Sequence, residues 1–233
     1  MMAAAKSMGL AKRRIRVSFK VVTAPLVCYN RKNGGEGLKK LGSDLYNRDT
    51  LAVARELLGK YLVRVEDGIP LTVRITETEA YIGRLDKACH AYGYKRTART
   101  ETLFAPPGTA YIYLIYGMYH CLNFVTEAEG EPAAVLIRAG EPVTQTDADA
   151  ISKRRFGCAA EHMTTYQRKN FLNGPGKLCK GLSLTKAQNG LSLAGDTLYV
   201  LDSGEIPKNI RISKRIGIDY AEEAVDFPWR FYL

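Results

Sequence analysis

The sequence VRITETEAYIG, residues Val73–Gly83, predicts the β-strand from which the fold and the function of this chain are interpreted. Side chains on a strand alternate between its two faces, so one face is expected to carry Ile75, Glu77, Glu79 and Tyr81. Carboxylates on a face that begins with an isoleucine are costly to bury unless they are paired or used in chemistry. The stretch is therefore predicted to be a catalytic strand.

Composition and charge indicate a globular protein with an anionic partner. The chain has 233 residues, 46% hydrophobic and 25% charged, which is ordinary for one large domain or two small ones. It has no apolar run of about eighteen residues, so no membrane span is predicted. The net charge of +10 favours nucleic acid first and an acidic membrane surface second. A basic protein without such a partner fits the charge equally well.

The cysteines indicate thiols rather than a disulfide or zinc framework. There are five, at positions 28, 89, 121, 158 and 179, and no Cys-x-x-Cys pair occurs. Reduced thiols in an intracellular protein are the simplest interpretation, and neither a metal nor a cofactor is expected. The 14 tyrosines suit a protein that contacts phosphates and bases, although tyrosine is also common in cores.

The chain divides into a basic arm and one domain. Residues 1–35 hold eight Lys or Arg and no Asp or Glu, and Asn33-Gly34-Gly35 follows. We predict a disordered arm over 1–40, which adds non-specific attraction to phosphates, and a single domain over 41–233. An organelle transit peptide, a nuclear signal, an unstructured leader and an expression artefact remain open for the arm, which lacks the apolar region of a secretory signal.

Hydrophobic periodicity and turn residues predict a mixed α/β (α+β) fold. A helix is expected over 44–58, capped at its start by Asp49 or Thr50 and at its end by Gly59. Asp67-Gly68 predicts a hairpin turn before the central strand. The other predicted helices are 146–156 and 177–182, and the predicted strands are 61–65, 71–82, 110–114, 133–139, 196–201 and 210–216.

Several further segments follow the carboxylate strand in a fixed order. They are Lys87–Ala91, Pro107–Tyr119 with Asn123, Ala133–Ala139, Asn173–Cys179 and Trp229–Leu233. In this order and spacing the set resembles the alkyladenine (3-methyladenine, methylpurine) DNA glycosylases of base-excision repair. The resemblance covers residues 41–143 and 173–233, is weak across 144–172 and is absent from 1–40. It implies a curved, mostly antiparallel sheet or barrel flanked by helices, similar to the C-terminal domain of formyltransferases.

The resemblance implies roles for two charged residues. Glu79 matches the catalytic glutamate, the general base that draws a proton from the water attacking C1′ of the target nucleotide. Arg138 matches the arginine that holds this water and the adjoining phosphate. Glu77, one pleat earlier, is given no catalytic role and is expected to be paired or exposed.

The resemblance also implies a pocket for a base flipped out of the duplex. Tyr81 and Tyr113 match the tyrosines that sandwich the base together with His90, whose backbone reads the purine edge. Leu136 is placed in the same pocket, and Asn123 matches the residue that rejects guanine. Tyr111 is interpreted as core packing. The wedge that fills the vacated position in the minor groove matches Tyr116, with Met118 and Tyr119 beside it.

Together these inferences predict a monofunctional DNA glycosylase that acts as a monomer on double-stranded DNA with damaged purines. The expected substrates are 3-methyladenine, 7-methylguanine, hypoxanthine and ethenoadenine, and the expected compartment is the nucleus in a eukaryote or the cytoplasm in a bacterium. Two alternatives stay open, a non-catalytic nucleic-acid-binding module on the same scaffold and a metal-dependent phosphodiesterase using Glu77 and Glu79. The sequence departs from the family pattern at 97–100, 127–132 and 218–221.

Overall fold

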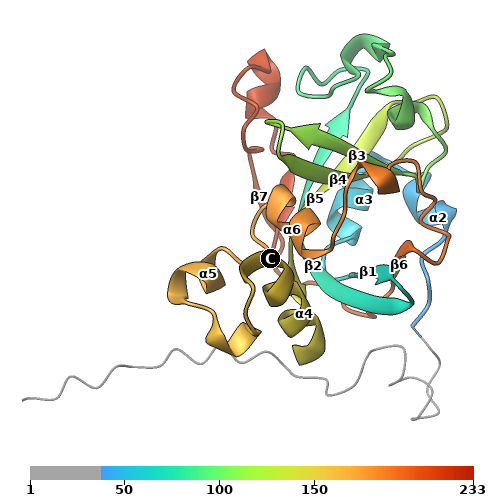
Figure 1. Cartoon of the computed structure of the whole chain (residues 1–233). Coiled ribbons are helices and arrows are strands. Elements are labelled where there is room, and N and C mark those ends of the chain that lie inside the picture. The colour runs from blue at the N-terminus through green and yellow to red at the C-terminus, as the bar shows by residue number, and fades with distance from the viewer. Residues whose placement is uncertain (1–37) are drawn as a thin grey trace, which may run out of the picture.

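The predicted strand forms the centre of an antiparallel sheet in the computed structural model, which describes residues 38–233 (Figure 1). This strand, β2 (Ile69–Ile82), pairs with β5 (Ala133–Pro142) along one edge. Along its other edge it pairs first with β1 (Tyr61–Glu66) and then with β8 (Arg230–Tyr232). The path through the sheet runs β3-β4-β5-β2-β1-β6, and β7 pairs with β8. The mixed α/β fold with a mostly antiparallel sheet is confirmed, whereas the likeness to formyltransferases stays a prediction.

The remaining elements are short. They are α2 (Ser43–Tyr46), α3 (Thr50–Glu56), β3 (Ala110–Ile115), β4 (Tyr119–Val125), α4 (Gln145–Phe156), α5 (Thr165–Lys169), α6 (Pro175–Gly181), β6 (Leu198–Leu201) and β7 (Arg211–Ser213), with 3-10 turns η1 (Tyr92–Tyr94), η2 (Glu101–Phe104), η3 (Ala160–His162), η4 (Lys186–Gln188) and η5 (Glu222–Asp226).

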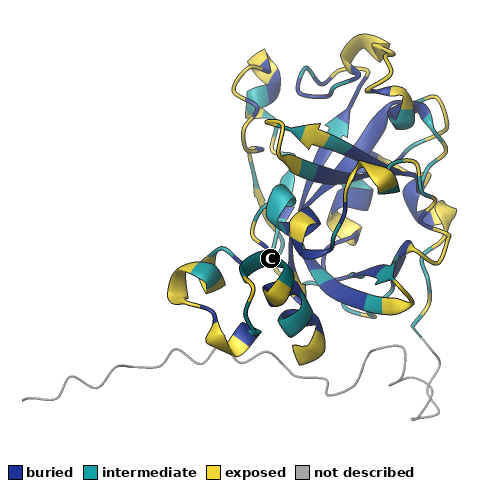
Figure 2. Ribbon diagram, viewed as in Figure 1, coloured by how far each residue is buried: buried dark blue, intermediate teal, exposed yellow. Residues whose placement is uncertain are grey.

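The prediction that Ile75 shares a face with Glu77 and Glu79 is wrong. The pairing of β2 with β5 shifts register on both sides of Glu77, as in a β-bulge. Before the bulge Ile75 faces the main core, and after it Thr78 does so, where its hydroxyl donates to the Ala54 carbonyl of α3 at 2.7 Å. The extra residue at the bulge reverses the alternation. The carboxylates therefore face away from the main core, while Leu71, Val73 and Ile75 before the bulge are buried in it. The start of β2 at Ile69 is exposed, and the rest of the strand is mostly buried (Figure 2).

The single helix predicted over 44–58 is also wrong, because the segment forms two helices. α2 ends at Tyr46, with Asn47 as its C-cap, and the Asp49 side chain accepts the Ala52 N–H, which begins α3 as a new helix. The predicted cap at Asp49 is confirmed, but it lies between two helices rather than at the start of one.

The sequence analysis did not predict β4, α5 or β8. β4 completes a hairpin with β3, whose turn has positive φ at both Tyr116 and Gly117. β8 contains only three residues and brings the chain end beside the bulge of β2. Of the predicted basic arm, residues 1–37 lie outside the described residues, and Lys40 forms a bridge with Leu201.

Helices and loops enclose the two faces of the sheet unequally. α3 and α6 pack on the face that holds the main core, while α4 and α5 form a lobe beside α6 (Figure 1). The opposite face carries a smaller cluster that includes Phe104, Tyr111 and Val125. Among the described residues no helix is long and apolar enough to span a membrane.

Candidate active site

A cavity of about 1160 Å³ opens beside the carboxylate half of β2. Its walls come from the β3–β4 hairpin, from β5, from the α4–α6 lobe and from the segment 216–220. Every predicted pocket residue lines it, namely Tyr81, His90, Tyr113, Asn123 and Leu136, as do Arg138, Tyr116 and Tyr119. The structure thus brings together residues that lie up to about sixty positions apart in the sequence.

Glu79 lies immediately behind this cavity and has no exposed side-chain surface. Its Oε1 accepts the Ile216 backbone N–H at 2.9 Å. Its Oε2 accepts the Tyr81 hydroxyl at 2.8 Å and Arg138 Nη1 at 3.2 Å. All three donors belong to residues that line the cavity. The carboxylate is therefore linked to the cavity through the three groups that bind it.

The pKa of Glu79 reflects opposing causes. Burial raises it above the ordinary carboxyl value, while Arg138, the Ile216 N–H and the Tyr81 hydroxyl act to lower it. The negative charge of Glu77 adds a smaller upward effect. Removing Arg138 or the Tyr81 hydroxyl is therefore expected to raise the pKa of Glu79, and removing the charge of Glu77 is expected to lower it.

Arg138 joins both carboxylates of the strand. Its Nε donates to Glu77 Oε1 at 2.9 Å while its Nη1 reaches Glu79. Arg230 Nε of β8 donates to the same Glu77 oxygen at 2.6 Å. The expectation that Glu77 is paired agrees with this geometry. Two arginines thus donate to Glu77. The bond from Arg138 to Glu77 also fixes the guanidinium of Arg138 beside Glu79.

A buried ion pair supports the other side of the site. Arg215 binds both carboxylate oxygens of Asp86, at 2.5 and 2.7 Å, and neither side chain has any exposed surface. The same guanidinium donates to the Ala80 carbonyl and lies 4.7 Å from the Tyr81 ring centroid. Because the next residue is Ile216, this pair positions both the tyrosine and the backbone donor that bind Glu79.

An aromatic group forms the opposite wall of the cavity. The His90 ring lies edge-on to Tyr113 with centroids 4.5 Å apart, and its Nδ1 is 3.0 Å from the Tyr111 hydroxyl. Burial, assisted by the positive charge of Arg99, lowers the pKa of His90 to about 4. The imidazole is therefore neutral at pH 7, which suits packing against an uncharged or cationic base.

Asn123 is held in a defined orientation in the floor of the pocket. Its Nδ2 donates to the backbone carbonyls of Tyr111 at 3.1 Å and Cys121 at 3.4 Å. Both amide hydrogens then face the backbone, which leaves the side-chain oxygen as the group presented to a ligand. Leu136 lies opposite in the register of β4 and β5 and supplies an apolar surface.

The hairpin tip projects three large side chains into solvent. The exposed fractions are 78% for Tyr116, 67% for Met118 and 46% for Tyr119. Exposed side chains of this size at one tip mark a contact surface. The left-handed backbone at Tyr116 (φ 53°) is sterically unfavourable for a residue with a side chain, so the tip is held in a strained turn.

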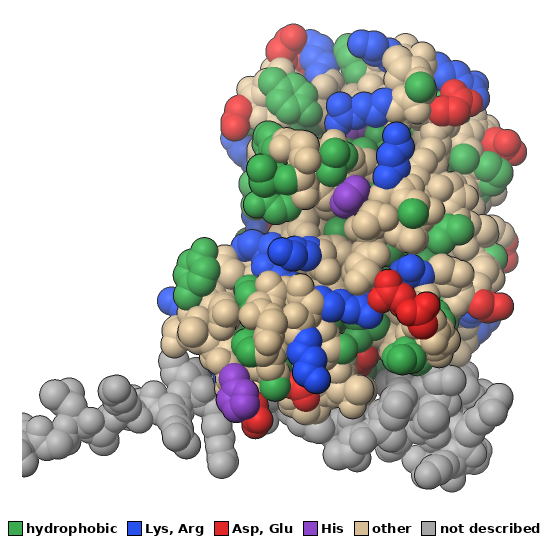
Figure 3. All heavy atoms as spheres, in the orientation of Figure 1, with side chains coloured by type: hydrophobic (Ala, Val, Ile, Leu, Met, Phe, Trp, Pro, Cys, Tyr) green, Lys and Arg blue, Asp and Glu red, His purple; other side chains and the backbone are tan. Residues whose placement is uncertain are grey.

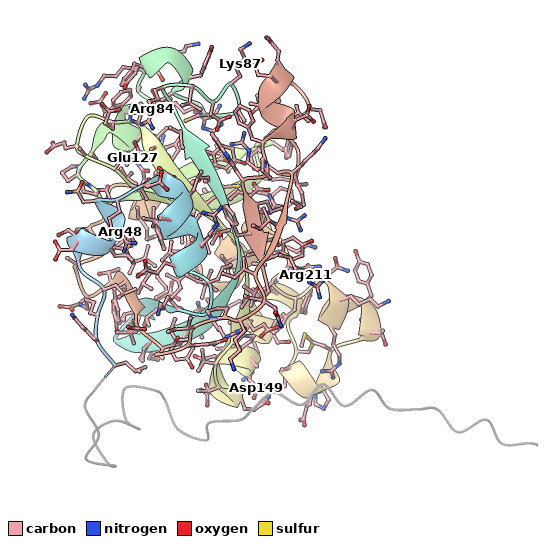
Figure 4. The ribbon with its side chains drawn as sticks, turned by 180° about the vertical axis from the view of Figure 1, so that it is seen from behind. Arg48, Arg84, Lys87, Glu127, Asp149 and Arg211 are labelled. Atoms are coloured by element: carbon pink, nitrogen blue, oxygen red, sulfur yellow. The ribbon has the colours of Figure 1, made fainter. Side chains whose placement is uncertain are left out.

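Several residues of the site escaped the sequence analysis. Arg99 lies over the Tyr113 ring at 5.5 Å, and Ile216, Tyr220 and Lys177 line the cavity. Arg215 and Arg230 act from behind it. Of the departures from the family pattern, 97–100 and 218–221 thus lie at the site. The insertion 127–132 does not line the cavity. Its first residue, Glu127, binds Arg84 and Thr50 (Figure 4).

The acidic side chains of the site pair with arginines rather than forming a metal-binding cluster. Within residues 38–233 no group of three or more His, Cys, Asp or Glu side chains is placed to hold a metal ion. Both strand carboxylates are instead bonded to arginines. The donor set fits proton transfer and anion binding better than metal coordination.

Comparison with known proteins gives a consistent result. The family described as methylpurine-DNA glycosylase matches residues 44–233. A relative from Clostridium perfringens is 54% identical over 197 residues, which is 83% of this chain and 95% of the relative. One from Desulfitobacterium hafniense is 50% identical over 196 residues, 84% of this chain and 96% of the relative. Both bear the assigned name 3-methyladenine DNA glycosylase.

Replacing Arg215 by Met is expected to destabilise the protein strongly, because Asp86 is left buried without its partner. The free energy of unfolding should fall by about 3–5 kcal/mol. Urea unfolding followed by the fluorescence of Trp229, the only tryptophan of the chain, measures this, since Arg215 lies 5.0 Å from that ring.

Lys214→Met is the matched control, because Lys214 forms an exposed pair with Asp226. Its loss should change the free energy of unfolding by no more than about 1 kcal/mol. Equal effects of the two substitutions would contradict the supporting role given to the buried pair.

Proposed function

The chain belongs to the methylpurine-DNA glycosylase family, and we propose that it releases alkylated and deaminated purines from duplex DNA through a water activated by Glu79. Membership makes it a DNA glycosylase of base-excision repair. The substrate class proposed is 3-methyladenine, 7-methylguanine, hypoxanthine and ethenoadenine. The observation that carries the proposal is the buried carboxylate of Glu79, bonded to three residues that line one aromatic cavity.

The proposed reaction is a hydrolysis at C1′ of the flipped nucleotide. The C1′–N bond breaks, and the purine leaves with the bonding electron pair. The water oxygen bonds to C1′, and Glu79 takes its proton. Positive charge develops on the sugar in the transition state, so a carboxylate behind it also contributes electrostatic stabilisation. Arg138 holds the water and keeps Glu79 ionised, and a positioned base contributes roughly 10²- to 10⁴-fold.

Glu79 can accept from a water without losing one of its donors. An ionised carboxylate offers about four acceptor sites on its two oxygens, and three of them are occupied here. Oε1 accepts only from the Ile216 N–H. We propose that the remaining acceptor site binds the attacking water.

The pocket discriminates by shape and by hydrogen bonding. Tyr81 and the Tyr113–His90 pair provide facing aromatic surfaces, which favour electron-poor alkylated purines. The Asn123 side chain is fixed by the hydrogen bonds that its Nδ2 donates to two backbone carbonyls, and it is proposed to reject guanine by a steric clash with the exocyclic amine. Tyr116 enters the minor groove as the wedge, with Met118 and Tyr119 beside it. All of these residues come from one chain, so one copy suffices on DNA.

Glu79→Gln should bind a duplex with one hypoxanthine but release base at least about 10²-fold more slowly. The amide keeps the shape of the side chain but cannot accept the proton of water. Chromatographic detection of free hypoxanthine under single-turnover conditions measures this rate, and a gel-shift assay measures binding. Absence of release by the unsubstituted chain, with DNA bound normally, would contradict the proposed reaction.

The pH dependence of release provides a second test. Glu79 must be ionised, so the rate is retained above its folded-state pKa and is lost as pH falls through it. Arg138 lowers this pKa, and Glu77 raises it. Arg138→Gln should therefore move the acid limb of the pH–rate profile to higher pH, and Glu77→Gln should move it to lower pH. Shifts in the same direction would rule out Glu79 as the titrating group.

Tyr116→Asn tests the wedge function of Tyr116 independently of its effect on folding stability. Asparagine tolerates the left-handed backbone, so the free energy of unfolding should be unchanged or higher. Release from duplex DNA should fall about tenfold or more, because nothing fills the vacated stack, whereas release from single-stranded DNA should change little. Equal losses on both substrates would contradict a wedge function.

A further inference from the structure

The segment Asn173–Cys179 belongs to the family pattern, but the reaction above uses none of it. It forms the start of α6, and Lys177 from this helix is half-buried and lines the cavity. Cationic side chains gather where the α4–α6 lobe meets the body of the molecule (Figure 3). The cavity-lining members of this group are Arg155, Lys177 and Lys180.

Two asparagines hold the ammonium group of Lys177 in place. Nζ donates to Asn170 Oδ1 and to Asn173 Oδ1, both at 2.8 Å. The Nδ2 of Asn170 donates to the Tyr166 carbonyl at 3.0 Å, and that of Asn173 to the Lys169 carbonyl at 2.7 Å. These carbonyls accept only from an N–H, so both amide oxygens must face Lys177.

This arrangement fixes the position of a positive charge without neutralising it. Both partners are neutral amides, whereas a lysine with a purely structural role is commonly paired with a carboxylate. An ammonium has three N–H groups, and two of them are used here. The third has no acceptor among residues 38–233 and remains for a ligand. Burial and the like charge of Arg155 lower the pKa of Lys177, so an added anion would relieve an unfavourable arrangement.

Arg155, on the neighbouring helix α4, is a second cation that is held by a neutral group. Its Nη1 donates to the Phe171 carbonyl, and its Nε is buried without a hydrogen-bond partner among the described residues. Burial lowers its pKa. Lys177 and Arg155 are thus neighbouring cations held by neutral groups, and both side-chain types serve in phosphate recognition.

The lysine is also close to the proposed chemistry. Asn173 forms a bridge with Ala139, the residue after Arg138. On the other side, a Cβ at Gly176 would lie 2.9 Å from Tyr119 Cβ, so α6 is pressed against the β3–β4 hairpin close to its tip. Lys177 therefore lies between the arginine that binds Glu79 and the hairpin that carries the wedge.

We propose that Lys177, held by Asn170 and Asn173, is a preformed subsite for one backbone phosphate of the DNA strand that carries the flipped nucleotide. This inference rests on the proposed function, because it needs a flipped nucleotide in the adjacent pocket. The subsite fixes the strand on the α6 side of the cavity while Tyr116 fills the stack on the hairpin side.

The test measures affinity for a duplex with one hypoxanthine at a series of KCl concentrations, with Glu79→Gln in the full chain to prevent turnover. Each neutralised phosphate contributes about 0.9 to the slope of log affinity against log salt. Adding Lys177→Gln should therefore reduce the slope by about that amount. Lys186→Gln is the control, because Lys186 is exposed on η4 and does not line the cavity.

An unchanged slope for Lys177→Gln overturns the subsite, and so does an equal reduction for Lys186→Gln, which would indicate a general effect of charge. These outcomes are distinct from failure of the proposed function, which is absence of base release by the chain with Glu79 intact.

A pair of substitutions at Asn173 tests the mechanism without removing the lysine. Asn173→Asp places a carboxylate against Lys177, so it should reduce the slope as Lys177→Gln does. Asn173→Ala loosens the ammonium but keeps its charge, so it should retain most of the slope. In the Lys177→Gln background Asn173→Asp should have a much smaller effect. Full additivity of the two substitutions would show direct repulsion of DNA and would overturn the proposal.

Discussion

Burial of the Glu79 carboxylate is the constraint on which this structure depends. A charged group without exposed surface is stable only when hydrogen-bond donors replace water. Those donors come from three places, namely Tyr81 on β2 itself, Arg138 on β5 and the backbone of Ile216. The fold must therefore bring the centre of the sheet and a late loop to one point. The short strands β7 and β8 and the Asp86–Arg215 pair perform this task.

The bulge at Glu77 allows one strand to serve two environments. Before it, β2 is an ordinary strand with its apolar face on the main core, paired with β1. After it, the partner on that edge becomes β8, and the phase of alternation is reversed. Bulges recur beside active sites because they redirect side chains without interrupting the strand. Here the redirection places Glu79 and Tyr81 toward the cavity while Thr78 remains anchored to α3.

Local patterns predicted the parts of the site that lie on regular strands. Alternation correctly grouped Glu79 with Tyr81, whose hydroxyl donates to that carboxylate, and the family resemblance selected residues that the structure gathers at one cavity. Alternation failed at the bulge, because an extra residue in one strand depends on the pairing with its neighbour. Arg215 was missed for a related reason. A single arginine in a polar segment has no local signature, and its partner Asp86 lies 129 residues away.

The distribution of positive charge separates the structural cations from those proposed to meet the ligand. Arg138, Arg215 and Arg230 each face a carboxylate, and their charges are matched within the fold. Removing Arg215 leaves the buried charge of Asp86 without its partner. Arg155 and Lys177 are instead bonded to neutral oxygens, so the fold positions their charges but does not match them. Cations without a carboxylate partner attract polyanions to a neighbouring cavity. This attraction weakens as the salt concentration rises. A net charge of +10 therefore says less about DNA binding than the identity of the partner that each cation already has.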